Sequence, residues 1–583
     1  MTSGRGAVAL AIALALAPPA RAHAATAAAE PGARTGAPTA TSGNANVVEK
    51  MFDEWRFRDG TVALQELVRA APQAPQTLVM EGYAAFLKGD YEGSVRKLNT
   101  AIEEAGSTEP TAAAAAKELQ GLASEARDAV KDHREERSTH FLMRYPAEDA
   151  VLVPYALEAL EAAYSALHQD LGFEEEIPIR VEIYRSPSDL AAVSSLSPAE
   201  VARTGTIALC KWARLMVTTP RALAYGYPWL DSMNHELVHY AVSSLTGDRA
   251  PVWLQEGLAK FLERRWREPA GGRLAPSMEH LLARALHTGK LISFDAMHPS
   301  MAKLPSAEDA TLAFAEVANA VAYLHSLGGM PALRAAIQKV ASGVDARTAV
   351  ADTAGGSWAD FERGWRGFMN AQHYKTFAAI DIPTTHIRKS GAIASRRKPT
   401  EDEALTSSQK QAPAFRYLRL GNMMLQNNRL RAAAVEYEKG AKVSGVALGG
   451  PTTAVSARAA ARAGDPAVHW IFPVKLGRIY LALGEPDRAI KALSGAVTLY
   501  PDLPWPHLIS GQAMLAKGDA AGALVALKTS LATNPFDPAV HCALAEAYAK
   551  LPSPTAPATA ATPPPPPGVR EREQRFCREL AEP

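Results

Sequence analysis

The stretch NHELVHY, residues 234–240, carries two histidines four residues apart and a glutamate directly after the first. Its surroundings have an amphipathic helical pattern without internal glycine or proline. On a helix, residues i and i+4 share one face with Cβ atoms about 6 Å apart. The imidazoles of His235 and His239 can therefore reach one divalent ion at about 2.1 Å, the usual Zn–N distance. Glu236 is rotated by about 100°, so it can take a proton from a water that the ion has made acidic.

The H-E-x-x-H pattern also occurs by chance on surface helices, so the next helix matters. Asp248 and Pro251 form a helix start signal ahead of the apolar stretch VWLQEGLA. Glu256 lies in that apolar turn, where a carboxylate is costly unless it is paired or coordinated. A short connection between the helices brings Glu256 to a third ligand position and leaves the fourth for water. Three protein ligands and an open position are typical of a catalytic zinc (Zn²⁺) site.

Short β-branched or alternating runs precede the two histidines along the chain. Residues 140–146 and 177–186 each read as a strand, and a helical pattern separates them. Residues 205–219 read as a pair of strands. The sequence after residue 219 is helical in pattern. We therefore expect an α+β domain, with a small mixed sheet followed by a helical subdomain that carries the H-E-x-x-H motif.

The C-terminal third contains an internal repeat. Three pairs of positions are 34 residues apart: Gly477 and Gly511, Ala489 and Ala523, and Pro501 and Pro535. Small residues let the two helices of a hairpin approach closely, and proline ends the second helix. The spacing resembles the tetratricopeptide repeat, a helix–turn–helix unit. Residues 417–440 look like an earlier unit followed by about 22 extra residues, and residues 80–105 match more weakly.

The N-terminus has one arginine, an apolar run over residues 7–17 and small residues at Ala20, Ala22 and Ala24. This pattern favours a cleaved signal peptide over a buried N-terminal helix. Eleven apolar residues are too few to cross a bilayer, which takes about 20, and no later stretch looks like a transmembrane segment. We expect an exported chain, periplasmic or secreted and soluble once the signal peptide is removed.

The three cysteines form neither a disulfide framework nor a C-x-x-C pair. A bridge between Cys542 and Cys577 stays open, and Cys210 is most simply a small buried hydrophobe. The net charge of +1 and the absence of a basic stripe argue against nucleic-acid binding. The expected organisation of the chain is a signal peptide (1–24), a flexible leader (25–46), a tetratricopeptide-like helical domain (47–135), a catalytic domain (136–378), a linker (379–412), tetratricopeptide-like repeats (413–551), a Pro/Ala-rich segment (552–569) and a C-terminal tail (570–583).

The segment HELVHY…PVWLQEGLAKFLE resembles the gluzincin zinc metallopeptidases, in particular the bacterial peptidase MA-like domain, over roughly residues 136–370. The resemblance implies that His235, His239 and Glu256 bind zinc and that Glu236 is the general base in peptide-bond hydrolysis by a zinc-activated water. It also implies that the strand ending near Thr218 is the edge strand along which an extended peptide substrate binds.

The chain departs from that family at one position. Related enzymes often use a tyrosine hydroxyl to stabilise the oxyanion, and the matching residue here is Phe314. Tyr323 and His325 are nearby but face differently on a helix. Loss of one such donor typically costs about 10²–10³-fold in rate. An alternative is therefore a weak or inactive peptidase-like scaffold that binds partner proteins through its repeats. A third hypothesis is a peptidase whose target is captured by the repeats.

Several other polar and aromatic residues have simpler interpretations. Asp231 is either a partner of a ligand histidine or an N-cap. Trp229 and Trp253 are expected in the core. Three arginines, Arg264, Arg265 and Arg267, are expected at a solvated helix end.

Overall fold

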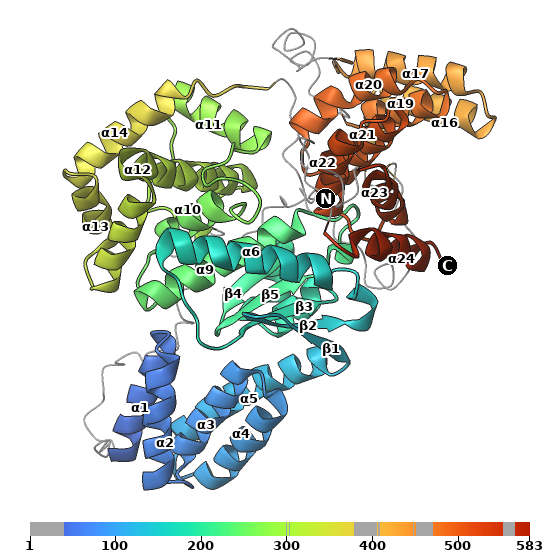
Figure 1. Ribbon diagram of the computed structural model, residues 1–583. Helices are drawn as coiled ribbons and strands as arrows, with labels where there is room; N and C mark the ends of the chain where they lie inside the picture. The colour runs from blue at the N-terminus through green and yellow to red at the C-terminus, as the bar shows by residue number, and fades with distance from the viewer. Residues whose placement is uncertain are drawn as a thin grey trace.

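The computed structural model describes residues 40–377 apart from 299, 302 and 303, residues 409–449 apart from 447, and residues 470–551 and 566–582, together with Glu401 and Leu405 (Figure 1). The predicted signal peptide, most of the predicted linker, most of the residues inserted between the repeats and most of the Pro/Ala-rich segment lie outside the described residues. Among the described residues, no helix combines the length and the apolar character needed to cross a membrane.

Helices form the N-terminal part of the described chain. They are α1 (Ala40–Asp53), α2 (Phe57–Ala70), α3 (Pro75–Lys88), α4 (Tyr91–Ala105) and α5 (Pro110–Val130). Helix α1 begins inside the segment predicted to be a flexible leader, and that prediction is wrong for residues 40–46. The reason is packing, because Ala45 and Val48 of α1 are buried in the core.

A five-stranded sheet follows these helices. Its strands are β1 (His133–Arg137), β2 (Phe141–Pro146), β3 (Ile179–Tyr184), β4 (Ala208–Lys211) and β5 (Arg214–Thr218). The order is β1-β2-β3-β5-β4, with parallel pairing of β2, β3 and β5 and antiparallel pairing at both margins. The small mixed sheet and its four predicted strands are confirmed. Strand β1 was not predicted, because its sequence HREER is charged and mostly exposed.

The position of the edge strand differs from the prediction. The strand that ends at Thr218 is β5, and it lies between β3 and β4 with hydrogen-bonded neighbours on both sides. The edge on this side of the sheet is β4. The hairpin turn at Trp212 and Ala213, both with positive φ, folds β4 along the outside of β5. Neighbours in the sequence alone do not tell which strand of a hairpin is outermost.

The central domain continues with helices. They are α6 (Val153–Leu171), between β2 and β3, then α7 (Pro187–Ala192), α8 (Pro198–Thr204), α9 (Trp229–Thr246), α10 (Val252–Leu262), α11 (Pro276–Thr288), α12 (Ala307–Ala341), α13 (Ala346–Thr353) and α14 (Trp358–Ala371). The helical subdomain behind a small sheet is therefore confirmed. Helix α12 is broken at Gly328 and Gly329, whose backbone angles are not helical.

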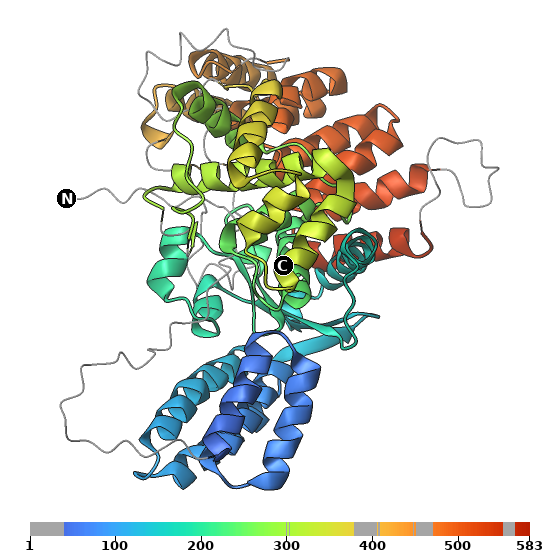
Figure 2. The same cartoon turned by 90° about the vertical axis from the view of Figure 1, so that its left-hand side faces the viewer.

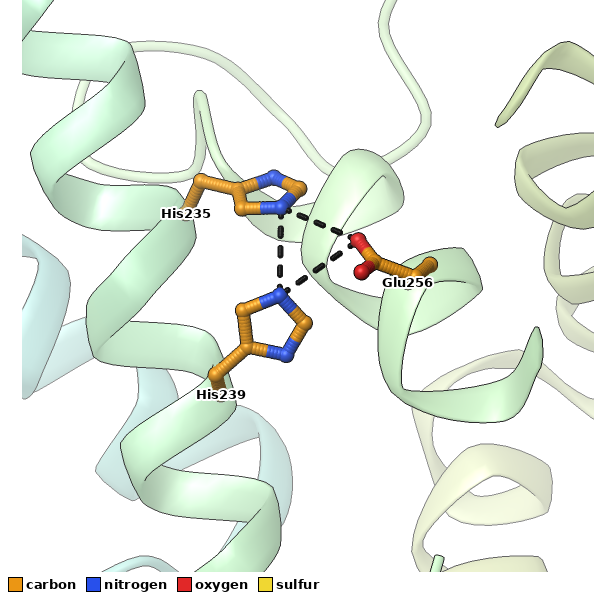
Figure 3. Close-up of side chains that lie close together, drawn as sticks. All are labelled: His235, His239 and Glu256. Carbon is orange, nitrogen blue, oxygen red and sulfur yellow. Dashed lines mark hydrogen bonds and ion pairs between the residues drawn. The ribbon is translucent and has the colours of Figure 1, made fainter. Parts of the chain in front are cut away.

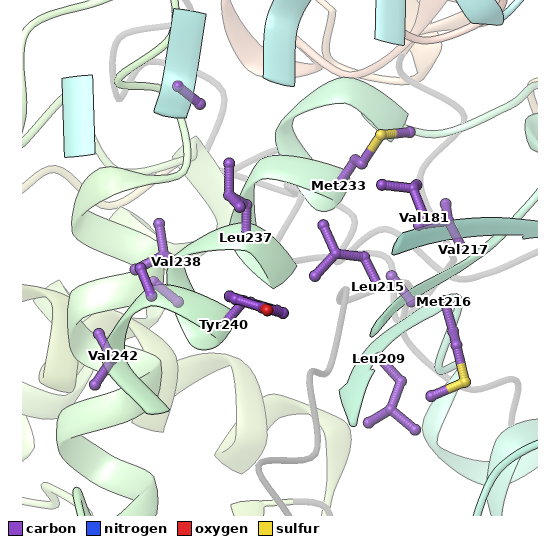
Figure 4. Close-up of a cluster of buried hydrophobic side chains, with 14 of the residues drawn as sticks. Val181, Leu209, Leu215, Met216, Val217, Met233, Leu237, Val238, Tyr240 and Val242 are labelled. Atoms are coloured by element: carbon purple, nitrogen blue, oxygen red, sulfur yellow. The ribbon is translucent and has the colours of Figure 1, made fainter. Parts of the chain in front are cut away.

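The two faces of the sheet have different partners. One face is apolar, and its Val181, Leu215 and Val217 lie in one cluster with Met233 and Leu237 of α9 (Figure 4). This alternation of side chains along each strand is the expected period of two. Helix α9, which carries the H-E-x-x-H motif, is thus held against the margin of the sheet formed by β5 and β4.

The opposite face is polar and binds the N-terminal helices, which lie below the sheet in Figure 1. The guanidinium of Arg180 donates to the backbone carbonyls of Phe86 and Leu87, at 3.2 and 2.9 Å. These carbonyls lie at the C-terminal end of helix α3, where a cation interacts favourably with the helix dipole. Glu182, fully buried, accepts from Arg214 at 3.0 Å, which supplies the paired charge that a buried carboxylate requires.

The C-terminal part consists of helix pairs. They are α16 (Phe415–Gln426) with α17 (Leu430–Val443), α19 (Ile471–Ala482) with α20 (Pro486–Leu499), α21 (Pro504–Ala516) with α22 (Ala520–Leu531), and α23 (Pro538–Lys550) with α24 (Val569–Ala581). Helix α24 forms most of the segment predicted as a C-terminal tail, and a disulfide between Cys542 and Cys577 joins it to α23.

Four of the helix pairs share one close contact. A Cβ atom on Gly477 or Gly511 would lie only 2.8 or 2.6 Å from the leucine sixteen residues later, Leu493 or Leu527. Gly82 in α3 would clash in the same way with Leu98 of α4, and Gly421 meets Tyr437 at the same spacing. Glycine is therefore required where the two helices of a pair cross. The same device in α3–α4 makes the N-terminal pair a repeat of the same kind.

The repeats do not form a separate body. Leu515, Leu527 and Leu531 belong to the same hydrophobic core as the central domain, whereas the helices from α16 to α20 surround a second core. In Figure 2 the last helices, in red, lie beside the central domain. Tyr155 of α6 donates to Glu573 of α24 at 2.7 Å inside this contact. The final helix pairs therefore complete the core of the central domain.

Candidate metal centre

Helix α9 is buried on every side from Trp229 to Ser243. Its amphipathic pattern predicted an exposed face, and this expectation is wrong because α6, the sheet, α10 and α12 enclose the helix. His235, Glu236 and His239 are consequently 0, 0 and 4 % exposed. Buried polar groups need partners, so the contacts of these three side chains indicate the chemistry of the site.

The side chains of His235, His239 and Glu256 converge (Figure 3). Their nearest atoms are 3.2 Å apart between the two Nε2 atoms, 3.3 Å from His235 Nε2 to Glu256 Oε2, and 3.4 Å from His239 Nε2 to the same oxygen. Ligands about 2.0–2.1 Å from a tetrahedral ion lie about 3.3–3.4 Å from one another. The three atoms therefore have the spacing of three ligands of one zinc ion.

Each histidine is held by its other ring nitrogen. His235 Nδ1 lies 3.1 Å from Glu263 Oε2, and Lys260 donates to the other oxygen of that carboxylate at 2.7 Å. An acceptor at Nδ1 assigns the proton to Nδ1 and leaves the Nε2 lone pair directed toward Glu256 and His239. This is the tautomer that binds a metal through Nε2.

The second histidine has an equivalent support. His239 Nδ1 lies 3.2 Å from Gln255 Oε1, and the Gln255 amide donates to Ser243 at 3.0 Å. Ser243 in turn donates to Asp248 at 2.8 Å. This chain of hydrogen bonds crosses from α10 back to the end of α9. Asp248, predicted as part of the start signal of α10, thus supports the site instead; the residue before α10 is Pro251.

The carboxylates around the histidines determine their charge in the metal-free protein. Burial lowers the pKa of His235, but hydrogen bonds with Glu256 and Glu263 outweigh burial and raise the pKa to about 9. Burial raises the pKa of Glu263, but Lys260 and His235 outweigh burial and lower this pKa to about 2. The pKa of Glu256 is also lowered, because His239 and His235 outweigh its burial. His235 is therefore protonated at neutral pH in the metal-free protein, and its positive charge balances the two carboxylates.

Glu236 is different from the other carboxylates. It is fully buried, and neither of its oxygens has a hydrogen-bond partner among the described residues. Burial raises its pKa to about 7, although the nearby His239 and His235 oppose the rise. A buried carboxylate without a partner is rare and calls for an explanation. It directly follows His235, on the helix that packs against the edge strand β4.

Both interpretations of Asp231 are wrong, because its partners are side chains at the end of α10. Asp231 accepts from Trp266 at 3.0 Å and from Arg267 at 2.5 Å, and it contacts neither histidine ligand. The N-cap residue of α9 is Pro228. Arg265 pairs with Asp170 at 2.7 Å. The three arginines are partly exposed, as predicted, and they also tie the end of α10 to α9 and α6.

Two supporting residues escaped sequence reasoning, Glu263 and Gln255. Glu263 lies seven residues after Glu256, which is two helical turns and the same face, and this spacing could have identified it. Gln255 adjoins the ligand Glu256 and has no comparable signal. Trp229 and Trp253 are buried, as predicted.

The position of the expected oxyanion donor is apolar. Phe314 is fully buried on α12. Tyr323 packs against Phe361 and Phe368, with ring centroids 5.3 and 5.6 Å apart, and His325 packs against Phe261 at 5.2 Å. Neither is part of the cluster formed by the two histidines and Glu256.

Comparison with known families agrees with this site. Residues 159–371 match the family model described as the Peptidase MA superfamily. This segment is similar to the Peptidase MA superfamily. The matched range of the Peptidase MA superfamily domain contains α9 and α10, and with them His235, Glu236, His239 and Glu256. The comparison with curated proteins finds no match.

Two solved structures are similar over most of the chain. The crystal structure of the P58(IPK) TPR domain has 11% sequence identity, covers 94% of this chain and 100% of its own, and has a TM-score of 0.18. The crystal structure of the APC/C hetero-tetramer Cut9-Hcn1 has 10% identity, covers 93% and 94%, and has a TM-score of 0.21. These scores are too low to establish a shared fold. The tetratricopeptide-like character of the repeats rests on their 34-residue spacing and glycine contacts.

Proposed function

We propose that the chain is a zinc-dependent metallopeptidase of the H-E-x-x-H…E type that hydrolyses peptide bonds. The observation that supports it best is the convergence of three buried donor atoms at 3.2–3.4 Å from one another beside the unpartnered carboxylate of Glu236. A peptidase-like function is also what the Peptidase MA superfamily match indicates.

His235, His239 and Glu256 would hold the zinc ion. A bound zinc ion would polarise the substrate carbonyl and make a water acidic. Glu236 takes the proton from the attacking water and returns it to the leaving nitrogen, which is the work of a general base and acid. Its two free oxygens suit this role, because neither is committed to a structural hydrogen bond.

The substrate is a peptide or protein in extended form. Strand β4 is a sheet edge, and it contacts α9. An extended peptide can add to such an edge through main-chain hydrogen bonds. The site residues are 0–4 % exposed, so neighbouring segments must move outward before a peptide reaches Glu236.

The test compares two single variants. Glu236→Gln should retain about one zinc per chain and lose peptide cleavage by at least about 10³-fold, since the ligands are intact and the base is absent. Glu256→Ala should lose zinc itself. Equal cleavage of a peptide library by the wild-type chain and Glu236→Gln would refute the mechanism.

The alternative function is a peptidase-like scaffold that binds partners through the repeats, and the specific observation in its favour is Phe314. A wild-type chain that binds one zinc and cleaves no member of a broad peptide library would establish the scaffold.

Export to the periplasm or the cell exterior is part of the proposal. It is supported by the N-terminal apolar run and by the Cys542–Cys577 disulfide, because disulfides persist mainly in oxidising compartments. Expression with and without residues 1–24, followed by fractionation, tests it.

A further inference from the structure

The C-terminal repeats bind the segment that leads into helix α9. The backbone N–H of Tyr227 donates to the carbonyl of Thr533 at 3.1 Å. The indole Nε1 of Trp229, the first residue of α9, donates to the carbonyl of Leu531 at 3.3 Å. Leu531 is the last residue of α22. Two hydrogen bonds therefore join the start of α9 to the end of α22.

The end of α22 is suited to accept the indole N–H. The usual helical donor to the Leu531 carbonyl would come from the residue four positions later, which is Pro535 and has no N–H. The C-terminal end of a helix carries a partial negative charge and the N-terminal end a partial positive one. Trp229 therefore supplies a donor that α22 lacks, and the two helix ends have complementary charge.

The backbone at Gly226 approaches the repeats as closely as a chain can. Its φ of +79° lies in the left-handed region that favours glycine, and a Cβ atom there would overlap the carbonyl oxygen of Thr533. The preceding residue, Tyr225, packs against Trp505 of α21 with ring centroids 6.0 Å apart. The contact leaves no room for a side chain at Gly226, so it holds the entry to α9 in one place.

Trp229 and Glu236 lie on the same face of α9, because seven residues make nearly two helical turns. Both side chains are fully buried. Met233 lies between them along the helix and packs in the apolar cluster on the sheet (Figure 4). Apolar packing is not directional, whereas a hydrogen bond constrains both distance and angle. The indole hydrogen bond therefore restrains the rotation of α9 about its own axis.

A small rotation of α9 would displace Glu236 by a distance that matters for catalysis. Side chains extend to about 5–6 Å from a helix axis, so a rotation of about 10° moves them by about 1 Å. Misplacement of a reacting group by about 1 Å costs up to about 10²-fold in rate. The contact with the repeats thus acts on the most sensitive coordinate of this side chain.

We propose that Trp229 is a positioning residue for Glu236, and that the C-terminal repeats are thereby part of the catalytic unit. The hydrogen bond between the Trp229 indole and the Leu531 carbonyl holds α9 in one rotation and so places the Glu236 carboxylate. This inference rests on the proposed function, because it takes Glu236 as the general base.

The test removes the indole N–H and keeps an aromatic ring. In the full-length chain, Trp229→Phe should bind about one zinc and keep the wild-type KM for a cleavable peptide, with kcat at least about tenfold lower. Trp365→Phe is the matched control. Trp365 is 2 % exposed in the same domain, but its indole nitrogen has no hydrogen-bond partner among the described residues. This control should keep the wild-type kcat, and equal kcat values for the two variants would overturn the inference alone.

Hydrogen exchange of the metal-free chain gives a second measurement that does not depend on cleavage. Loss of one hydrogen bond should quicken exchange in residues 230–240 by about 2–10-fold in Trp229→Phe, and Trp365→Phe should match the wild-type chain. Faster exchange without a lower kcat would show that the bond is only structural, which overturns the inference. A wild-type chain that cleaves no peptide would instead overturn the proposed function, and with it the role of Trp229.

Discussion

The Nδ1 atom of His235 lies 3.1 Å from Oε2 of Glu263, inside the buried contact between α9 and α10. The pair joins the helix that carries the two histidines to the helix that carries the third ligand. Because Glu263 fixes the tautomer and the ring orientation of His235, it would tune the proposed zinc site without being a ligand.

Replacing Glu263 should therefore weaken zinc binding. We expect Glu263→Ala to lower zinc affinity by about 10–100-fold, and Glu263→Gln to lower it less, since an amide oxygen still accepts from Nδ1. Competition with a chromophoric chelator measures the affinity. An equal affinity of Glu263→Ala and the wild-type chain would show that the contact is only structural.

The pKa of His235 predicts how pH affects the metal-free protein. Its folded pKa is about 9, above the ordinary value of 6.5. A raised pKa means that the contribution of protonated His235 to stability is fully present below pH 6.5 and is lost as the pH rises toward 9. The pKa of Glu236 is raised from 4.5 to about 7. Its protonated form therefore also stabilises the fold, and this contribution is lost as the pH rises from 4.5 to about 7. Thermal unfolding of the chelated protein should therefore shift to lower temperature from pH 5 to 9. Saturating zinc should remove most of the His235 dependence, and His235→Gln serves as its control in the metal-free protein.

Substitution of two leucines at equivalent repeat positions should destabilise different parts of the molecule. Leu493 and Leu527 are both fully buried and lie against Gly477 and Gly511, so each change to alanine should cost about 2–5 kcal/mol. Leu527 is in the core shared with the central domain and Leu493 is in the separate one. Hydrogen exchange should accordingly quicken in α9 for Leu527→Ala and stay within the repeats for Leu493→Ala. Identical exchange patterns would contradict the shared core.

The same shared core bears on deletion of the repeats. A chain without residues 413–551 loses the side chains that cover α6 and the segment before α9, so we expect it to be insoluble or unfolded. Point variants at exposed positions of the repeats are therefore the proper means to separate target capture from peptide cleavage.

The disulfide between Cys542 and Cys577 closes a loop across 35 residues. Its removal by Cys542→Ser with Cys577→Ser should destabilise the α23–α24 pair by about 2–4 kcal/mol. Thiol titration of the denatured chain checks the pairing. One reactive thiol, from Cys210, is expected before reduction and three after it; three thiols before reduction would rule out the bridge.

Sequence reasoning was strongest where chemistry depends on local spacing. The i, i+4 histidines, the strand runs and the 34-residue repeat each follow from a period of the backbone, and the structure shows them as helix, strands and helix pairs. It was weakest for solvent exposure and strand order. An amphipathic pattern would leave one face of α9 exposed, but other elements enclose this helix. Strand β4 takes the edge position that the resemblance gave to β5.

By itself the sequence determined which side chains could bind a metal, since the turn of a helix places His235 beside His239 whatever surrounds it. Only the tertiary structure decided that Glu256 meets them, that Glu263 and Gln255 orient them, and that Glu236 is left without a partner. The physical reason is range: helical geometry acts over four residues, whereas the packing of α9 between the sheet, α10 and α12 depends on segments that lie far apart in the chain.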